Sequence, residues 1–302
     1  MNYFITGGTG SVGKELVRQL SELITVGRIV IFSRNESRQA EMAAEFPEGG
    51  EAGVRYFIGD ICDYDRLLFA MKGSGIVIHA AAMKHIDKCE YNPTESIKNN
   101  VFGTMNVARA CSELKVSEAL FISTDKACSP ISAYGAQKYA SERFWIGMNN
   151  MSSTRFNLVR YGNVRKSTGS FYHKWKTLVA EGKPLPVTSD KMSRFFWNIE
   201  SAAFFIINCL VDEKSLSDRG CIYVPKMKSE KLIDIAKSIS DNIEITGLRC
   251  PEKLQEELIC SFEGNNCYDC GDHYILYPDL HEWVGTIVKR GVKCVEGFSL
   301  SS

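Results

Sequence analysis

The strongest constraint on the fold is a glycine-rich turn between the first apolar segment of the chain and its first helix. We predict a buried strand over Asn2 to Thr6 and, directly after it, a turn that opens a helix running to about Leu23. Glycines at every third position of this turn permit a tight bend, a close approach of the backbone to a pyrophosphate, and close packing of helix on strand. This context predicts a dinucleotide site formed by Gly7, Thr9, Gly10, Ser11, Val12 and Gly13.

Strands and helices alternate regularly over the first half of the chain. Such alternation predicts an α/β fold, in which a doubly wound parallel sheet of the Rossmann type carries helices on both faces. Reacting groups in sheets of this kind gather at the carboxyl ends of the strands. A long helix is predicted over residues 93–114, and the further strands over residues 28–32, 54–58, 75–79, 119–122 and 156–161.

The residues that follow the second, third and fourth strands suit the rest of a dinucleotide. Arg34 and Arg38 stand where an NAD-binding fold usually has an acidic residue, so we predict NADP; a solvated surface arginine is the alternative. Asp60 is placed to accept a hydrogen bond from the adenine amino group, and Ile61 to cover the adenine ring. The other candidates after these strands are Ser33, Ala80, Ala81, Ala82 and Lys84.

Two polar groups follow the fifth predicted strand. The first is the run from Ser123 to Lys126, and the second is Tyr134 with Lys138 four residues later. Residues four apart on a helix share one face. We therefore expect the Lys138 ammonium to lower the pKa of the Tyr134 phenol from about 10 and make it a usable base. An ordinary amphipathic helix is the alternative, but the position after an apolar strand favours a catalytic site.

Composition excludes several classes of protein. The 36 basic and 36 acidic residues balance, so bulk charge indicates neither a nucleic acid nor an anionic membrane as partner. No apolar run approaches the ~20 residues of a membrane span, and we expect a cytoplasmic chain without a secretory leader. The 11 cysteines suit reduced thiols better than disulfides. We predict no metal site, because one C-x-x-C pair is clear among Cys260, Cys267, Cys270 and His273.

Segments spread along the whole chain resemble a known superfamily. They are Ser33-Arg34-Asn35-Glu36, Phe57-Ile58-Gly59-Asp60, His79-Ala80-Ala81-Ala82-Met83-Lys84-His85, Glu90-Tyr91-Asn92-Pro93, Ser123-Thr124-Asp125-Lys126-Ala127, Arg160-Tyr161-Gly162-Asn163-Val164 and Tyr223-Val224-Pro225-Lys226. They are similar to the extended short-chain dehydrogenase/reductases, and most closely to soluble UDP-N-acetylglucosamine 4,6-dehydratases of the pseudaminic acid pathway. The Thr-Asp-Lys run is the most specific, because glucose-nucleotide dehydratases and 4-epimerases usually carry other residues there.

The resemblance implies an NADP-dependent lyase that converts UDP-N-acetylglucosamine into a 4-keto-6-deoxy sugar for surface glycans. Tyr134 implies the branch that inverts C5, because membrane-anchored relatives that retain C5 generally have Met there. A homo-oligomer built from dimers, up to a hexamer, is also implied. The implied domains are a Rossmann domain over 1–165, on which 190–212 packs back, and a smaller α/β nucleotide-sugar domain over 166–189 and 213–302.

The resemblance also implies roles at the sugar. Tyr134, activated by Lys138, takes the proton of the 4-hydroxyl as hydride leaves C4, and Thr124 orients that hydroxyl. Lys126 is the candidate base at C5 and must be neutral to act; Asp125 is the candidate acid for the departing 6-hydroxyl. Whether Lys126 or Tyr134 reprotonates C5 stays open. Tyr161 is added to the cofactor residues, and the substrate candidates are Lys84, His85, Asn163, Arg194, Arg249 and Glu252.

Three departures from the family pattern leave the exact substrate open. Cys250-Pro251 replaces the usual Pro-Gly, and Thr168 and Lys191 stand where Arg is common. A nucleotide-sugar 4-epimerase is the main alternative, since it would use Tyr134 and Lys138 without the Asp-Lys pair. A retaining dehydratase and a non-catalytic NADP-binding protein are the others.

Overall fold

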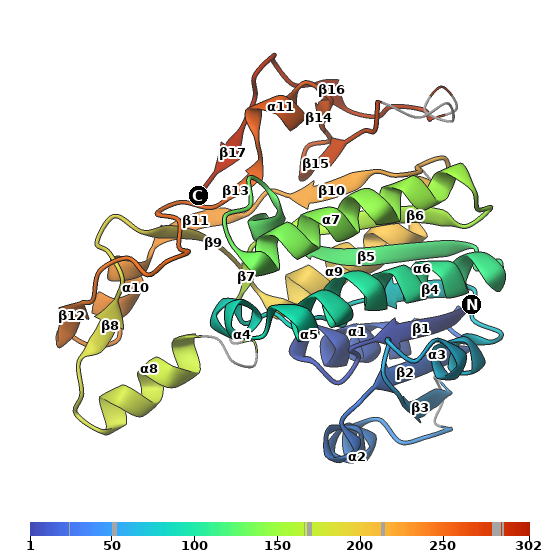
Figure 1. Ribbon diagram of the computed structural model, residues 1–302, viewed down its shortest axis with the longest axis horizontal. Helices are drawn as coiled ribbons and strands as arrows, with labels where there is room; N and C mark the ends of the chain where they lie inside the picture. Colours follow the sequence, from blue (N-terminus) through green and yellow to red (C-terminus); the bar gives the residue numbers. More distant parts are fainter. Residues whose placement is uncertain are drawn as a thin grey trace.

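The computed structural model describes residues 1–23, 25–49, 53–165, 167, 171–212, 215–279, 285 and 287–302. A ten-stranded sheet forms its centre, in the order β16-β14-β15-β10-β6-β5-β4-β1-β2-β3 (Figure 1). Its strands are β1 (Asn2–Thr6), β2 (Arg28–Ser33), β3 (Val54–Ile58), β4 (Ile76–His79), β5 (Glu118–Thr124), β6 (Arg155–Tyr161), β10 (Ile222–Pro225), β14 (Cys267–Asp269), β15 (His273–Leu276) and β16 (Val292–Lys293).

Within the sheet, the neighbouring strands β10, β6, β5, β4, β1, β2 and β3 run parallel to one another. The strands β15, β14 and β16 extend the sheet beyond β10, and each pairs antiparallel with its neighbour. Chain order reverses between β1 and β4, and ligands bind at such a reversal in open α/β sheets. The predicted doubly wound α/β fold is confirmed. Each predicted strand of the parallel part lies within two residues of the observed one.

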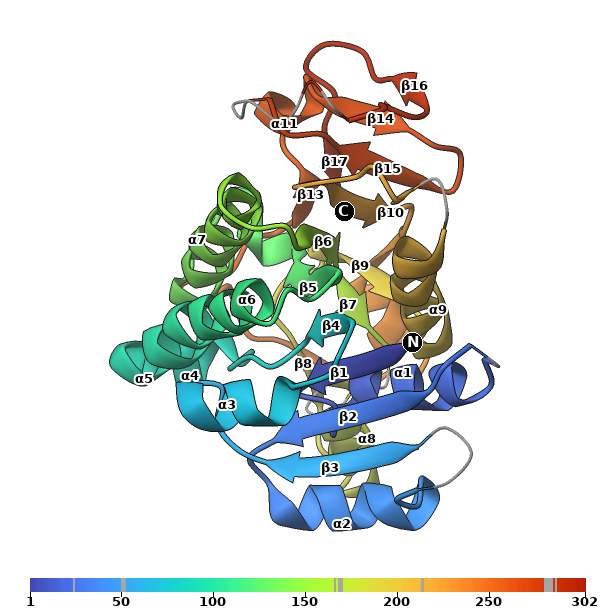
Figure 2. The same ribbon diagram turned by 90° about the vertical axis from the view of Figure 1, so that its right-hand side faces the viewer.

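Helices cover both faces of the sheet (Figure 2). Alternate strand residues such as Ile5 and Ile31 pack on one face, and their neighbours Phe4 and Val30 pack on the other. Both faces are therefore buried, which explains why the strands read as continuous apolar runs. The helices on the first face are α1 (Ser11–Ser21), α2 (Glu36–Glu45) and α9 (Ile199–Val211), and those on the second are α3 (Tyr64–Met71), α6 (Gly103–Glu113) and α7 (Ala133–Gly147).

The long helix predicted over 93–114 is present but irregular. It consists of α5 (Pro93–Ile97), a π-helical turn (Lys98–Phe102) and α6, and the short helix α4 (Ile86–Tyr91) precedes it. Asn100 lies in the π-helical turn. Its side chain accepts from the Met83 N–H at 2.7 Å and donates to the Gln137 side chain at 2.9 Å. The irregular turn thus ties the loop after β4 to helix α7.

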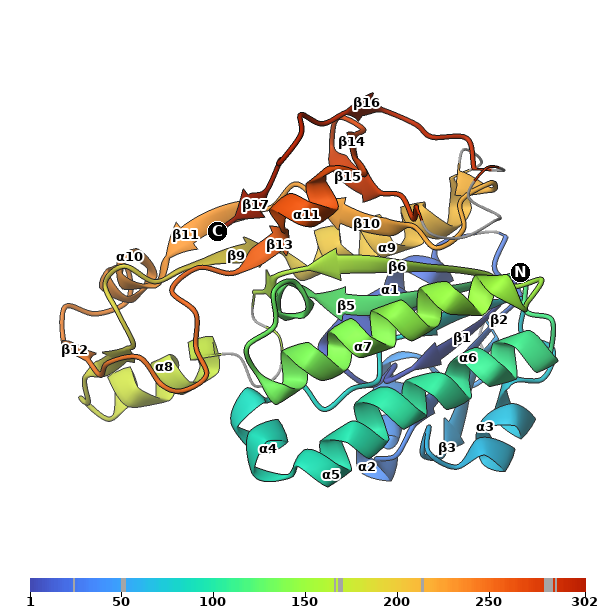
Figure 3. The ribbon, with the colours of Figure 1, turned by 45° about the horizontal axis from the view of Figure 1, so that its top comes forward.

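A smaller lobe lies beside the carboxyl ends of the parallel strands (Figures 1 and 3). It has its own core of Trp175, Leu185, Val187, Phe196, Ile235 and Ala236. The predicted domain boundaries stay a prediction, because residues 213–302 supply strands to the large sheet as well as parts of the lobe. The lobe's elements are α8 (Phe171–Ala180), β7 (Asn163–Val164), β8 (Leu185–Val187), β9 (Ser193–Trp197), β11 (Lys228–Lys231), α10 (Leu232–Lys237) and β12 (Ile243–Ile245).

The sequence also predicts a helix over residues 230–239 and a short helix at Glu256. The first is present as α10 but begins at Leu232, because residues 228–231 form β11 and pair antiparallel with β9. The second is absent from the described chain, where a loop leads instead into β13 (Glu257–Ile259), which pairs with β17 (Leu300–Ser301). The short helix α11 (Ser261–Gly264) follows β13.

Candidate active site

A cleft of about 630 Å³ runs along the carboxyl ends of the parallel strands. It passes over the point between β1 and β4 where chain order reverses. Every residue that the sequence assigned to the cofactor lines this cleft: Gly7, Thr9, Gly10, Ser11, Val12, Gly13, Ser33, Arg34, Arg38, Asp60, Ile61, Ala80, Ala81, Ala82, Lys84, Tyr134, Lys138 and Tyr161.

The glycine turn has the geometry that a dinucleotide requires. Gly7 has φ +68°, and a Cβ there would stand 2.8 Å from the Ala81 nitrogen. A Cβ at Gly13 would stand 2.4 Å from the Gly8 carbonyl oxygen, so α1 can approach the turn only with glycine at this position. Gly10 is the N-cap of α1 and has no side chain to satisfy the first-turn N–H groups. Backbone donors at a helix N-terminus are well suited to a pyrophosphate.

Charged residues line the end of the cleft beyond β2. Arg34 is about half exposed, and its Nη1 lies 3.7 Å from Asp60 Oδ2. Arg38 lies in the first turn of α2, which Asn35 caps by accepting from the Arg38 N–H at 2.9 Å. Two guanidinium groups therefore border the region where the sequence placed the ribose phosphate.

Tyr134 and Lys138 are both buried on α7, one turn apart. Lys138 Nζ donates to the Ile122 carbonyl at 2.6 Å and lies 3.8 Å from the centroid of the Phe121 ring. Burial lowers the pKa of Lys138 to about 7, although Glu142 acts against this shift. The same burial raises the pKa of Tyr134, and Asp125 raises it further. The prediction that the Tyr134 pKa is lowered was wrong in direction, because burial and the Asp125 carboxylate both favour the neutral phenol.

Thr124, Asp125 and Lys126 cluster where β5 ends. Asp125 is fully buried, and its Oδ1 accepts from Thr124 Oγ1 and from Lys126 Nζ, both at 2.9 Å. Its Oδ2 has no hydrogen-bond partner among the described residues. Thr124 and Lys126 line the cleft directly.

The pKa of Lys126 differs from the expectation that desolvation makes this residue neutral. Burial alone would lower it, but the carboxylates of Asp125 and Glu256 outweigh that effect, so the pKa of Lys126 is raised. Lys126 is therefore held as an ammonium beside Asp125.

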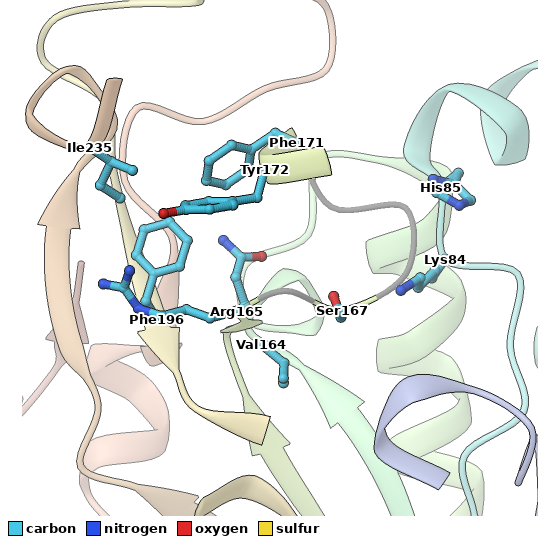
Figure 4. A pocket seen from close by; sticks show the side chains of 10 residues that line it. Lys84, His85, Val164, Arg165, Ser167, Phe171, Tyr172, Phe196 and Ile235 are labelled. Carbon is cyan, nitrogen blue, oxygen red and sulfur yellow. The ribbon is translucent and has the colours of Figure 1, made fainter. Parts of the chain in front are cut away.

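A pocket of about 230 Å³ adjoins the cleft on the lobe side and shares Lys84, His85 and Asn163 with it. These three are substrate candidates from the sequence. Figure 4 shows the rings of Phe171, Tyr172 and Phe196 gathered on one side of the pocket, with Lys84 and His85 on the other.

Sequence reasoning missed the aromatic side of this pocket. Phe171 and Phe196 come from separate elements, α8 and β9, with their ring centroids 5.9 Å apart. Arg165 lies over the Phe196 ring at 5.1 Å and pairs with Glu230. The adjacent aromatics at 171–172 were the one available signal, because the pairing of β9 with β7 and β11 is not visible locally.

The other substrate candidates, Arg194, Arg249 and Glu252, are not among the described residues that line either cavity. Arg194 is buried and donates to the backbone carbonyls of Ser193, Lys253 and Leu254. Arg249 is exposed, and its guanidinium pairs with Glu252 at 2.6 Å. Thr168 lies outside the described residues.

The cysteines are free thiols, and the set weighed as metal ligands does not come together. Among the residues that the structure describes, the group whose ligand atoms lie within 4.8 Å of one another is Cys128, Cys260 and Glu263. The Arg160 guanidinium already pairs with Glu263 at 2.8 Å. A cation would have to compete with that positive charge.

Three known proteins resemble this chain over most of its length. A family model described as polysaccharide biosynthesis protein matches residues 3–278. UDP-N-acetylglucosamine 4,6-dehydratase (inverting) of Campylobacter jejuni is 40% identical over 314 residues, which cover 100% of this chain and 92% of that protein. UDP-glucose 4-epimerase of Rickettsia bellii is 33% identical, covering 91% and 82%. The X-ray structure of Pen from Bacillus thuringiensis matches with a TM-score of 0.88 at 32% identity, covering 100% of this chain and 93% of that chain.

Within the described chain, no helix is both long enough and apolar enough to cross a membrane.

Proposed function

Because the chain belongs to the polysaccharide biosynthesis protein family, within the extended short-chain dehydrogenase/reductases, we propose that it is a UDP-N-acetylglucosamine 4,6-dehydratase that inverts C5. The observation that carries this proposal is that Lys126, which pairs with Asp125 at 2.9 Å, lines the same cleft as Tyr134 and Lys138. The full-length similarity to an inverting dehydratase supports it. A cytoplasmic location and a homo-oligomer built from dimers are part of the same proposal.

The cleft takes a nicotinamide dinucleotide, and we propose NADP. The glycine turn and the N-terminus of α1 would hold its pyrophosphate, and Arg34 and Arg38 would face a 2′-phosphate. When bound, the nicotinamide supplies a hydride acceptor for C4 and a hydride donor for C6. The sugar nucleotide would extend into the aromatic pocket of Phe171, Tyr172 and Phe196.

The side chains then divide the proton transfers. Tyr134 would take the 4-hydroxyl proton as a phenolate, although burial raises its pKa; the positive charge of a bound oxidised nicotinamide would favour that phenolate. Lys138 lies one turn away on α7, and Thr124 would orient the hydroxyl. The C4 ketone acidifies the C5 hydrogen, which Lys126 removes, while Asp125 protonates the departing 6-hydroxyl so that it leaves as water. Moving one proton across the 2.9 Å from Lys126 Nζ to Asp125 Oδ1 would give both reactive forms at once, a neutral amine and a protonated carboxyl. The short contact thus supplies an acceptor for the Lys126 proton, and the raised pKa of Lys126 opposes the transfer.

The test is direct. Incubation with UDP-N-acetylglucosamine in deuterated water should give a 4-keto-6-deoxy product of L-arabino configuration with deuterium at C5. Proton couplings around the ring report the configuration, and early sampling is essential because a 4-keto sugar epimerises slowly in solution. A first product of D-xylo configuration would contradict inversion and assign the retaining reaction.

A UDP-sugar 4-epimerase is the second candidate, favoured by the 33% identity to the epimerase of Rickettsia bellii. Mass spectrometry of the same incubation separates the two reactions. An epimerase leaves the mass of the sugar nucleotide unchanged, whereas a dehydratase lowers it by one water. A protein that only binds NADP leaves the substrate untouched.

A further inference from the structure

Glu256 is a buried carboxylate beside the candidate catalytic residues, and the proposed proton transfers do not use it. It directly precedes β13 and is only 4% exposed. Its backbone is fixed by Ser302, which accepts from the Glu256 N–H at 2.9 Å and donates its own N–H to the Glu256 carbonyl at 2.8 Å. The carboxylate therefore has a defined position against the end of β5.

Three cations face this carboxylate. Glu256 Oε1 lies 3.7 Å from Lys126 Nζ and 4.0 Å from Arg194 Nε, and Oε2 lies 3.8 Å from Lys253 Nζ. The nearby Asp125 carboxylate repels the Glu256 carboxylate and contributes to raising the Glu256 pKa. Oε2 has no hydrogen-bond partner among the described residues.

Of the three cations, only Lys126 faces the cleft. Arg194 donates to three backbone carbonyls, and Lys253 Nζ donates to the Cys128 carbonyl at 2.9 Å. Both are thus held by the backbone whether or not Glu256 is charged. Lys126 has one hydrogen-bonded anion, Asp125, and that carboxyl becomes neutral when it takes the proton from Lys126. Glu256 is the second anion within reach of the lysine.

We propose that Glu256 is a positioning residue for Lys126. The Glu256 carboxylate orients the Lys126 amine and stabilises the ammonium that forms when Lys126 takes the C5 proton. The proposal rests on the proposed dehydratase function. In that step the C5–H bond breaks and its proton goes to Nζ. The C5–H electrons form the C5–C6 double bond, and the C6–O bond breaks as Asp125 protonates the leaving oxygen. A fixed carboxylate that holds a base and stabilises its protonated form increases the strength of the base.

The decisive variant is Glu256→Gln, which keeps the shape and removes the charge. The basicity of Lys126 is read without any turnover from its rate of acetylation by acetic anhydride across pH, measured by mass spectrometry of the Lys126 peptide. Loss of an anion within 4 Å should lower the pH at the midpoint of the Lys126 acetylation curve by about one unit. Acetylation of Lys98, which is exposed, is the internal reference for reagent activity. Glu256→Asp keeps the charge, so its Lys126 midpoint should lie closer to the wild-type value than that of Glu256→Gln. Glu257→Gln, the next carboxylate along the chain, is the matched control and should leave it unchanged.

Turnover gives the second readout. In Glu256→Gln the incorporation of solvent deuterium at C5 should slow at least about tenfold, whereas transient reduction of the cofactor, which reports C4 oxidation, and KM should change little. A disrupted fold would instead affect cofactor reduction, KM and C5 exchange together.

The outcomes separate the two proposals. An unmoved Lys126 midpoint, or normal C5 exchange despite a moved midpoint, overturns the role of Glu256 while the dehydratase function stands. A wild-type protein that makes no 4-keto product overturns the function, and the catalytic role of Glu256 falls with it.

Discussion

Two lysines in this site lie in opposite electrostatic surroundings. Lys138 is buried against an aromatic ring and a backbone carbonyl, and its pKa falls to about 7. Lys126 lies between the carboxylates of Asp125 and Glu256, and its pKa rises. An ammonium at Lys138 is thus easily discharged at neutral pH, whereas Lys126 needs an adjacent acceptor for its proton. This difference matches the separate steps proposed for them, C4 oxidation and C5 deprotonation.

Replacing Asp125 by Asn should separate these steps. The amide cannot accept the Lys126 proton or protonate the 6-hydroxyl, so elimination should slow about 10²- to 10⁴-fold, while oxidation at C4 continues. Stopped-flow absorbance should show reduced cofactor accumulating without a 4-keto-6-deoxy product. Asp65→Asn, an exposed aspartate on α3, is the control and should behave as wild type. Full activity in Asp125→Asn would remove Asp125 from the acid role.

Arg34→Asp tests the choice of cofactor. Its guanidinium is about half exposed and has one carboxylate neighbour, Asp60 at 3.7 Å, so it is available to a phosphate. Loss of a charged hydrogen bond, worth about 1.5–3 kcal/mol, should weaken NADP binding roughly tenfold or more, with NAD affected much less. Fluorescence titration of both cofactors measures this. Equal affinity of the wild-type protein for NAD and NADP would refute the preference.

At the scale of single residues, the sequence predicted which side chains line the cofactor cleft, but not that Arg194 and Arg249 lie away from it, and not the charge states. The spacing of Tyr134 and Lys138 placed both on one helix face, as found. The directions of the pKa shifts of Tyr134 and Lys126 could not be predicted. Both shifts depend on burial and on Asp125, and the shift of Lys126 depends also on Glu256, which lies more than a hundred residues away in the chain.

At the scale of elements, the contact between α1 and the turn after β1 depends on Gly13. Gly13→Ala would place a methyl group 2.4 Å from the Gly8 carbonyl oxygen and push the helix away from the turn. We expect a loss of about 1–3 kcal/mol in the free energy of unfolding, together with weaker cofactor binding. Urea unfolding and cofactor titration measure the two effects.

A second helical glycine provides the control for this substitution. Gly147, at the end of α7, has helical φ −61°, and a Cβ there would have no described atom within 4 Å. Gly147→Ala should leave cofactor binding unchanged and keep or raise stability by about 0.5–1 kcal/mol. Equal effects of the two substitutions would contradict the argument from close packing.

Elements whose signals are local were predictable, and those that depend on distant partners were not. The parallel strands follow from apolar runs and were placed within two residues. β11 reads as the start of a helix, and it is a strand because β9, more than thirty residues earlier, pairs with it. The π-helical turn at 98–102 was missed for a similar reason, since the side chain of Asn100 bonds to Met83 and Gln137.

In the whole molecule, the hydrophobic cores on the two faces of the large sheet and the hydrophobic core of the lobe support different binding sites. The sheet cores support the cleft, and the lobe core supports the aromatic pocket. The lobe is assembled from two separate stretches of chain, residues 163–197 and 228–245, which explains why the sequence assigned a substrate region but not its aromatic residues. Because the lobe core shares no buried residue with the sheet cores in the described chain, we expect the two binding functions to be separable by mutation.

Two buried tryptophans make this expectation testable. Trp175 is 3% exposed in the lobe core, 4.6 Å from the Phe171 ring, whereas Trp145 lies in the sheet core and donates to the Asn157 carbonyl. Trp175→Ala should cost about 3–5 kcal/mol within the lobe, where local opening can occur without global unfolding. The KM for UDP-N-acetylglucosamine should rise at least about tenfold, while NADP affinity stays within error.

Hydrogen exchange shows where each substitution acts. In Trp175→Ala, protection should fall in α8 and β8 and remain in β1, β4 and β5, whereas Trp145→Ala should reduce protection across the sheet and weaken NADP binding too. If Trp175→Ala abolishes NADP binding, or if its exchange spreads into β1 and β4, the lobe and the sheet form one cooperative unit. In that case the sugar-nucleotide site could not be altered without disturbing the redox site, and substrate specificity would be a property of the whole fold.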